Sequence, residues 1–87
     1  MQSNNLQLYK GVIEMNLKDL RKESGIKAYK IAKELNISRV QLNNIESGKI
    51  KVNEEKIFLF SNIYKKDIDD IKKAWEVSIS ERAGNIL

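Results

Sequence analysis

Apolar residues recur at intervals of three and four along most of this 87-residue chain, which is the spacing of one face of an α-helix. Few stretches alternate strictly between apolar and polar residues, proline is absent, and only four glycines occur. The pattern therefore predicts an all-α fold. The expected helices cover about residues 16–25, 28–35, 39–46, 53–64 and 67–79, the last continuing to residue 79 or beyond.

Residues with distinctive backbone preferences mark the ends of these helices. Asn16, Ser38 and Asn53 carry side-chain oxygens of the kind that accept a hydrogen bond from the first turn of a helix. Gly25 is suited to the left-handed conformation that ends many helices. Asn36 tolerates the same conformation better than most residues do, so it predicts a tight turn between the second and third helices.

The two ends of the chain are less regular than its middle. Residues 1–14 fit a helical stripe that Gly11 interrupts, but they also suit a short strand, so they form an N-terminal arm of undetermined structure. Residues 15–79 make up a single domain, since the chain is too short for two. Residues 80–87 are expected to form a frayed tail.

The chain contains no cysteine and no histidine, which excludes disulfides, thiolate nucleophiles, the common zinc sites and the usual general base near neutral pH. A chain of this length also rarely forms both a core and a sheltered pocket. We therefore expect no enzyme activity, no cofactor and no metal. The longest apolar run, residues 57–60, is too short to span a bilayer, and no signal peptide begins the sequence, so we expect a cytoplasmic protein without a membrane partner.

The net charge of +4 is unevenly distributed along the chain. Residues 15–51 carry nine basic and four acidic residues, whereas residues 52–87 carry six basic and seven acidic residues. A solvated lysine-rich surface would account for this as well as a polyanion would. The asymmetry nevertheless indicates that a polyanion would bind the N-terminal half.

The helix expected over residues 39–46 has one apolar face and one polar face. At 100° per residue, Leu42 and Ile45 share the inner face. The outer face carries Arg39, Val40, Gln41, Asn43 and Asn44. Arginine donates twice to guanine, asparagine and glutamine pair with adenine, and valine contacts the thymine methyl group. An ordinary solvent-exposed face is the alternative, but such faces are usually rich in lysine and glutamate, which are scarce here.

Groups suited to DNA phosphates surround this helix. Free N–H groups at a helix N-terminus bind anions, and lysine side chains supply positive charge. The candidates are Lys27, Tyr29, Lys30, Ser38, Ser47, Lys49 and Lys51. Any one of these lysines could simply be solvated, so the prediction rests on their placement around a single helix.

Residues 16–71 resemble the Cro/repressor-type helix-turn-helix family of phage and bacterial regulators. The matching features are the LKDLRKESGI opening, Ile31-Ala32, Leu35, the turn Asn36-Ile37-Ser38-Arg39, the run Ile45-Glu46-Ser47-Gly48-Lys49, and the later Ile57, Ile63, Ile68 and Ile71. The resemblance implies a compact five-helix, repressor-like domain, here with an N-terminal arm and an extended C-terminal helix. Such domains bind an operator, usually as dimers, with the third helix in the major groove.

The resemblance also bears on the roles of Ala28, Asn36, Arg21 and Glu46. Family members often begin the second helix with a glutamine that contacts phosphate, but this chain has Ala28, which offers only its backbone N–H. The turn residue is often glycine, and here it is Asn36. Family members often pair an arginine of the first helix with the glutamate that ends the third, so we expect a structural ion pair between Arg21 and Glu46.

The C-terminal half carries more apolar surface than a small domain can easily cover. Residues 57–64 are apolar nearly all round, and a further stripe continues to residue 79. We therefore expect a homodimer whose interface contains Phe58, Leu59, Ile71, Trp75 and Ile79. The alternative is that Trp75 only completes the core of its own chain.

These observations predict a sequence-specific transcriptional regulator of double-stranded DNA, a repressor at an inverted-repeat operator. One alternative is an antitoxin-like autoregulator that also binds a partner protein. Another is a protein-interaction domain that keeps the fold without DNA binding, against which Lys49 and Lys51 argue.

Overall fold

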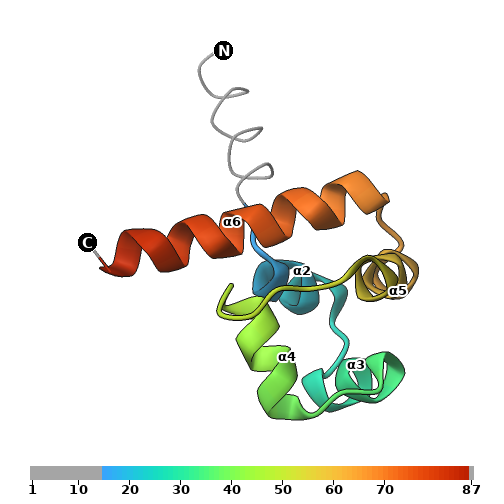
Figure 1. Ribbon diagram of the computed structural model, residues 1–87. Helices are drawn as coiled ribbons and strands as arrows, with labels where there is room; N and C mark the ends of the chain where they lie inside the picture. Colours follow the sequence, from blue (N-terminus) through green and yellow to red (C-terminus); the bar gives the residue numbers. More distant parts are fainter. Residues whose placement is uncertain (1–14, 87) are drawn as a thin grey trace.

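The computed structural model describes residues 15–86 and shows five helices joined by short turns (Figure 1). They are α2 (Leu17–Ser24), α3 (Ala28–Leu35), α4 (Arg39–Glu46), α5 (Glu54–Tyr64) and α6 (Ile68–Ile86). No strand occurs among the described residues, so the predicted all-α fold is confirmed. The expected N-terminal arm, residues 1–14, lies outside them.

Local sequence determines where these helices begin and end. The Oδ1 atoms of Asn16 and Asn53 accept hydrogen bonds from the backbone N–H groups of Asp19 (2.8 Å) and Lys56 (2.9 Å). Gly25 and Asn36 adopt left-handed backbone conformations, with φ of 75° and 58°. The expected caps at all four positions are therefore present. They supply partners for backbone groups that a helix end would otherwise leave unpaired.

A single apolar core lies where the five helices meet. α6 packs against α2, α4 and α5, while α3 packs against α4 and α5. The fully buried large side chains are Leu17, Ile31, Leu35, Leu42, Phe60 and Ile71. Because these side chains come from every helix, the short helices depend on tertiary packing for their stability.

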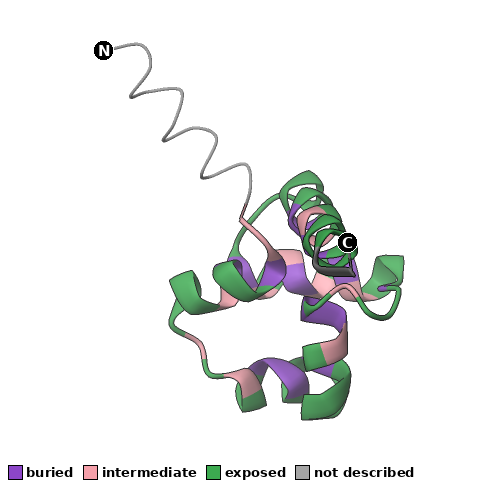
Figure 2. Cartoon of the chain, turned by 90° about the vertical axis from the view of Figure 1, so that its left-hand side faces the viewer, coloured by how far each residue is buried: buried purple, intermediate pink, exposed green. Residues whose placement is uncertain are grey.

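The last helix is longer than the sequence pattern indicates. We expected residues 80–87 to fray, but α6 continues to Ile86 and its C-terminal end projects past α4 (Figure 1), toward the viewer of Figure 2. A hydrogen bond of 2.6 Å from Asn16 Nδ2 to Glu81 Oε1 attaches this part of α6 to the start of α2. Serine, glutamate, arginine and alanine at positions 80–83 are also compatible with a helix.

Candidate nucleic-acid interface

Helices α3 and α4 form a helix-turn-helix whose turn is closed by backbone hydrogen bonds. The left-handed conformation of Asn36 ends α3, and its N–H donates to the carbonyl of Lys33 at 3.1 Å. The N–H of Ile37 donates to the carbonyl of Ala32 at 3.0 Å. The turn therefore fixes the direction in which α4 leaves α3.

The N-terminus of α4 is held by a reciprocal capping box. Ser38 Oγ accepts a hydrogen bond from the backbone N–H of Gln41 at 3.0 Å, and Gln41 Oε1 accepts one from the backbone N–H of Ser38 at 3.0 Å. We expected the cap by Ser38 but missed the return bond, although a serine three residues before a glutamine is the sequence signature of this motif.

The capping box changes what Gln41 offers a ligand. Its side-chain oxygen already accepts one hydrogen bond, so the exposed amide is held in one orientation and offers a ligand its Nε2 donors and the remaining lone pair of Oε1. Pairing with adenine needs both a donor and an acceptor. In this conformation the Nε2 donors of Gln41 can also serve guanine, thymine O4 or phosphate, and the expected adenine contact stays a prediction.

The expected outer face of α4 is the exposed one. Arg39, Gln41 and Asn43 are exposed, Val40 is 67% exposed, and Asn44 is half-buried. Leu42 and Ile45 are buried beneath them. The five side chains expected to contact bases therefore lie on the side of α4 away from the core, with Asn44 at its edge.

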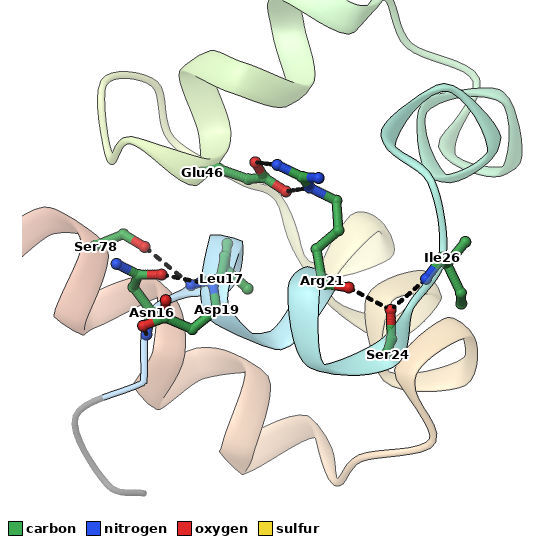
Figure 3. Close-up of polar contacts among 8 residues, drawn as sticks. All are labelled: Asn16, Leu17, Asp19, Arg21, Ser24, Ile26, Glu46 and Ser78. Carbon is green, nitrogen blue, oxygen red and sulfur yellow. Dashed lines mark hydrogen bonds and ion pairs between the residues drawn. The ribbon is translucent and has the colours of Figure 1, made fainter. Parts of the chain in front are cut away.

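The C-terminal end of α4 is held by the ion pair between Arg21 and Glu46 (Figure 3). Arg21 Nε lies 2.7 Å from Glu46 Oε2, and Nη2 lies 3.1 Å from Oε1, so the pair is bidentate. Only 17% of the Arg21 side chain and 3% of the Glu46 side chain are exposed. The hydrogen bonds to Glu46 raise the pKa of Arg21. Because each side chain is engaged by the other, this geometry suits a role in positioning α4 and not in catalysis.

The expected phosphate-contacting residues lie at the start of α3, at the start of α4, and at and beyond the end of α4. Lys27, Tyr29 and Lys30 are exposed at the start of α3, where Ala28 is half-buried and no side chain caps the helix. Ser47, Lys49 and Lys51 are exposed at and beyond the end of α4, and Ser38 is exposed at its start. The structure thus leaves seven of the eight candidate positions open to solvent.

The candidate dimer residues differ in how far they are exposed. Phe58 is 53% exposed and Ile79 is 37% exposed, while Leu59 and Trp75 are partly buried against the core. Ile71 is 0% exposed, so its assignment to a dimer interface is wrong. Ile71 lies on the inward face of α6, where it completes the core of its own chain.

Two small residues, Ser78 and Gly48, attach α6 to α2 and to the segment that follows α4. Leu17 N–H donates to Ser78 Oγ at 3.2 Å (Figure 3). A Cβ atom added to Gly48 would lie 2.8 Å from Ile79 Cα and 2.8 Å from the Ser78 carbonyl oxygen. The one sequence feature that marks this contact is Ser78 itself, a polar residue within an otherwise apolar helical stripe.

Two other features are absent from residues 15–86. No helix there combines the length and the hydrophobicity needed to cross a bilayer. No three acidic side chains of that region come together as a set of metal ligands.

Comparison with known families supports the assignment of α3 and α4. A family model described as Helix-turn-helix matches residues 17–71, which is more than half of the chain. Searches of curated proteins and of solved structures gave no significant match. The match covers α2 to the start of α6 and confirms the resemblance noted in the sequence. The chain therefore belongs to the Cro/repressor-type helix-turn-helix family, a family of DNA-binding regulatory domains.

Proposed function

We propose that this protein is a sequence-specific transcriptional repressor that inserts α4 into the major groove of an inverted-repeat operator. The observation that carries the proposal is the outer face of α4, which is exposed and supported at both ends. The capping box fixes its N-terminus and the Arg21–Glu46 pair fixes its C-terminus. Side chains held on a rigid helix discriminate between bases better than side chains on a mobile loop.

The exposed residues on and around α4 suit different parts of the DNA. Arg39 carries the donors suited to guanine, and Asn43 has both a donor and an acceptor for adenine. Exposed Val40 suits a thymine methyl group. The lysines at positions 27, 30, 49 and 51 contact the sugar-phosphate backbone and set the register of α4 in the groove.

Selection of binding sites from random duplexes, followed by footprinting, tests this function. Arg39→Ala and Asn43→Ala should each relax the base preference at particular positions, costing about 1–3 kcal/mol per specific contact. Asn62→Ala is the matched control, since Asn62 is exposed on α5, remote in sequence from α4. Failure to enrich any sequence, or equal effects of Asn43→Ala and Asn62→Ala, would count against sequence-specific binding.

We also propose that the protein binds its operator as a homodimer. The support is the apolar surface that the domain leaves exposed on α5 and α6, chiefly Phe58, Ile68 and Ile79. A two-fold dimer would place two copies of α4 about one helical turn of DNA apart, which requires an inverted repeat. Solution mass as a function of concentration tests the dimer, and Phe58→Ser should weaken it. A monomer at every concentration would refute the dimer and leave binding by single domains intact.

An operator that overlaps a promoter would exclude polymerase, and this is the simplest mode of action for so small a regulator. A reporter gene with the selected site moved stepwise across its promoter tests this. Repression is expected only where the site overlaps the polymerase-binding region. Increased expression from an upstream position would instead identify an activator.

A further inference from the structure

The C-terminal part of α6 lies outside the family match and borders the C-terminal half of α4. The match ends at residue 71, whereas α6 continues to Ile86 and projects past α4 (Figure 1). A hollow of about 550 Å³ lies between them. It is lined by Asn43 and Ser47 of α4, Asn16 and Lys18 at the start of α2, Glu81 and Arg82 of α6, and the buried Glu46 and Ser78. The hollow is therefore continuous with the surface proposed to contact bases.

The wall that α6 contributes is firmly attached. Ser78 Oγ accepts a hydrogen bond from the N–H of Leu17, and Glu81 accepts one from the amide of Asn16 (Figure 3 shows the Ser78 contact). The backbone of α6 at Ser78 also lies in direct contact with Gly48, just beyond α4. Three separate contacts therefore hold the segment of α6 that carries Arg82 against α2 and the end of α4.

The charges around the hollow leave positive groups available. Glu46 is occupied by Arg21, and Glu81 accepts the hydrogen bond from Asn16. Lys18 and Arg82 are exposed, and neither forms an ion pair with another residue of the described range. Arg21 neutralises Glu46, so the lining carries the two cations Lys18 and Arg82 against the single carboxylate of Glu81, whose hydrogen bond comes from a neutral amide. The net charge around the hollow is therefore positive, which suits an anion.

We propose that this hollow receives the sugar-phosphate backbone of the DNA strand that borders the groove occupied by α4, with Lys18 and Arg82 contacting its phosphates. The inference rests on the proposed function and extends the DNA-binding surface to a helix segment beyond the family domain. The major groove is about 12 Å wide, so a helix that fills it brings both bordering backbones close to its flanks. Asn43 and Ser47 place one flank of α4 against the hollow.

The salt dependence of binding tests this proposal. Affinity would be measured by fluorescence anisotropy with a selected duplex and with an unselected one, across a series of salt concentrations. Arg82→Gln and Lys18→Gln should each reduce the slope of log K against log salt by about 0.9, the value for one phosphate contact. Base preference should stay unchanged, because phosphate contacts carry no sequence information.

Two further variants separate a phosphate contact from a general charge effect. Lys73→Gln removes one exposed positive charge from the same helix, but position 73 lies nine residues before Arg82 and hence on the opposite face. It should leave the slope unaltered. Arg82→Lys keeps the charge and should retain the slope that Arg82→Gln loses. Melting curves of all four variants should match that of the wild type, because all three side chains are exposed.

The outcomes distinguish this inference from the function on which it rests. An unchanged slope in Arg82→Gln and Lys18→Gln, in a protein whose base preference still responds to Asn43→Ala, overturns the inference and leaves the function standing. Equal losses in Lys73→Gln and Arg82→Gln also overturn it. A wild type that binds neither duplex overturns both proposals together.

Discussion

Helices α4 and α6 are held against the same core by different means. α4 has eight residues, and side-chain hydrogen bonds fix both its ends, through Ser38 with Gln41 and through Arg21 with Glu46. α6 has nineteen residues and is attached near its middle, by the close approach of Gly48 and by the hydroxyl of Ser78. Side-chain pairs therefore fix the two ends of α4, whereas α6 is attached between its ends by the close approach of Gly48 and by hydrogen bonds of Ser78 and Glu81.

The difference follows from what each helix has to leave exposed. A helix of eight residues is not stable alone in water, so α4 needs tertiary support. The proposed DNA contact needs its outer face to stay open, and support at the two ends meets both needs. The proposal gives α6 no base-contacting face, so most of this helix can pack against the domain. Each type of attachment predicts a different response to substitution.

The largest expected effect comes from breaking the anchor of α4. Arg21→Ala would leave the buried carboxylate of Glu46 without a partner, which should cost about 3 kcal/mol of unfolding free energy. Glu46→Ala should cost less, because Arg21 is partly exposed and can be hydrated. Urea denaturation measures both losses, and DNA affinity should fall with them. If Glu46→Ala alters neither melting nor DNA affinity, the pair has no positioning role.

A second prediction addresses the packing of α6 through a matched pair of glycines. Gly25 and Gly48 both have φ of 75°, so alanine at either position incurs a left-handed penalty of about 1 kcal/mol. A Cβ atom at Gly25 would meet nothing within 4 Å, but one at Gly48 would clash with the backbone of α6. Gly48→Ala should therefore cost about 2 kcal/mol more than Gly25→Ala. If urea denaturation gives equal losses of unfolding free energy for Gly25→Ala and Gly48→Ala, then α6 shifts to accommodate the added Cβ atom at no measurable cost.

These two attachments also explain what the sequence could and could not predict. The limits of α3 and α4 followed from apolar spacing and from capping residues such as Ser38, because local side-chain chemistry determines them. The roles of Gly48 and Ser78 could not be predicted, because a small residue carries no sign of the distant backbone that it approaches. How far the last helix continues after Ile79 was left open for a related reason, since the contact between Asn16 and Glu81 that holds this part joins residues distant in sequence.

A third, smaller effect concerns Tyr64, which lies close enough to Arg21 and Glu46 to experience their charges. Its buried hydroxyl has no hydrogen-bond partner among the described residues, and burial raises its pKa well above the ordinary value of 10.0. An unpaired buried hydroxyl is destabilising, so Tyr64→Phe should raise the unfolding free energy by about 1 kcal/mol at neutral pH.

The same substitution predicts a dependence on pH. Above pH 10 the unfolded chain ionises Tyr64 while the folded chain keeps it neutral, so unfolding of the wild type becomes easier as pH rises. The advantage of Tyr64→Phe should then grow by about 1.4 kcal/mol per pH unit. The other tyrosines are present in both proteins, which makes the comparison specific to Tyr64. A variant less stable than the wild type at neutral pH would show that the hydroxyl is in fact bonded.

The smallest expected effect on stability, and the sharpest separation of stability from binding, comes from Gln41. Gln41→Glu keeps an oxygen for the N–H of Ser38 and adds a negative charge near a helix N-terminus, so unfolding free energy should change by no more than about 0.5 kcal/mol. It also removes the Nε2 donors and places a carboxylate on the face proposed to meet DNA, so affinity should fall markedly. Asn62→Asp makes the same change in net charge on exposed α5 and should bind normally. Equal losses of affinity in the two variants would mean that net charge, and not the position of Gln41 on α4, governs binding.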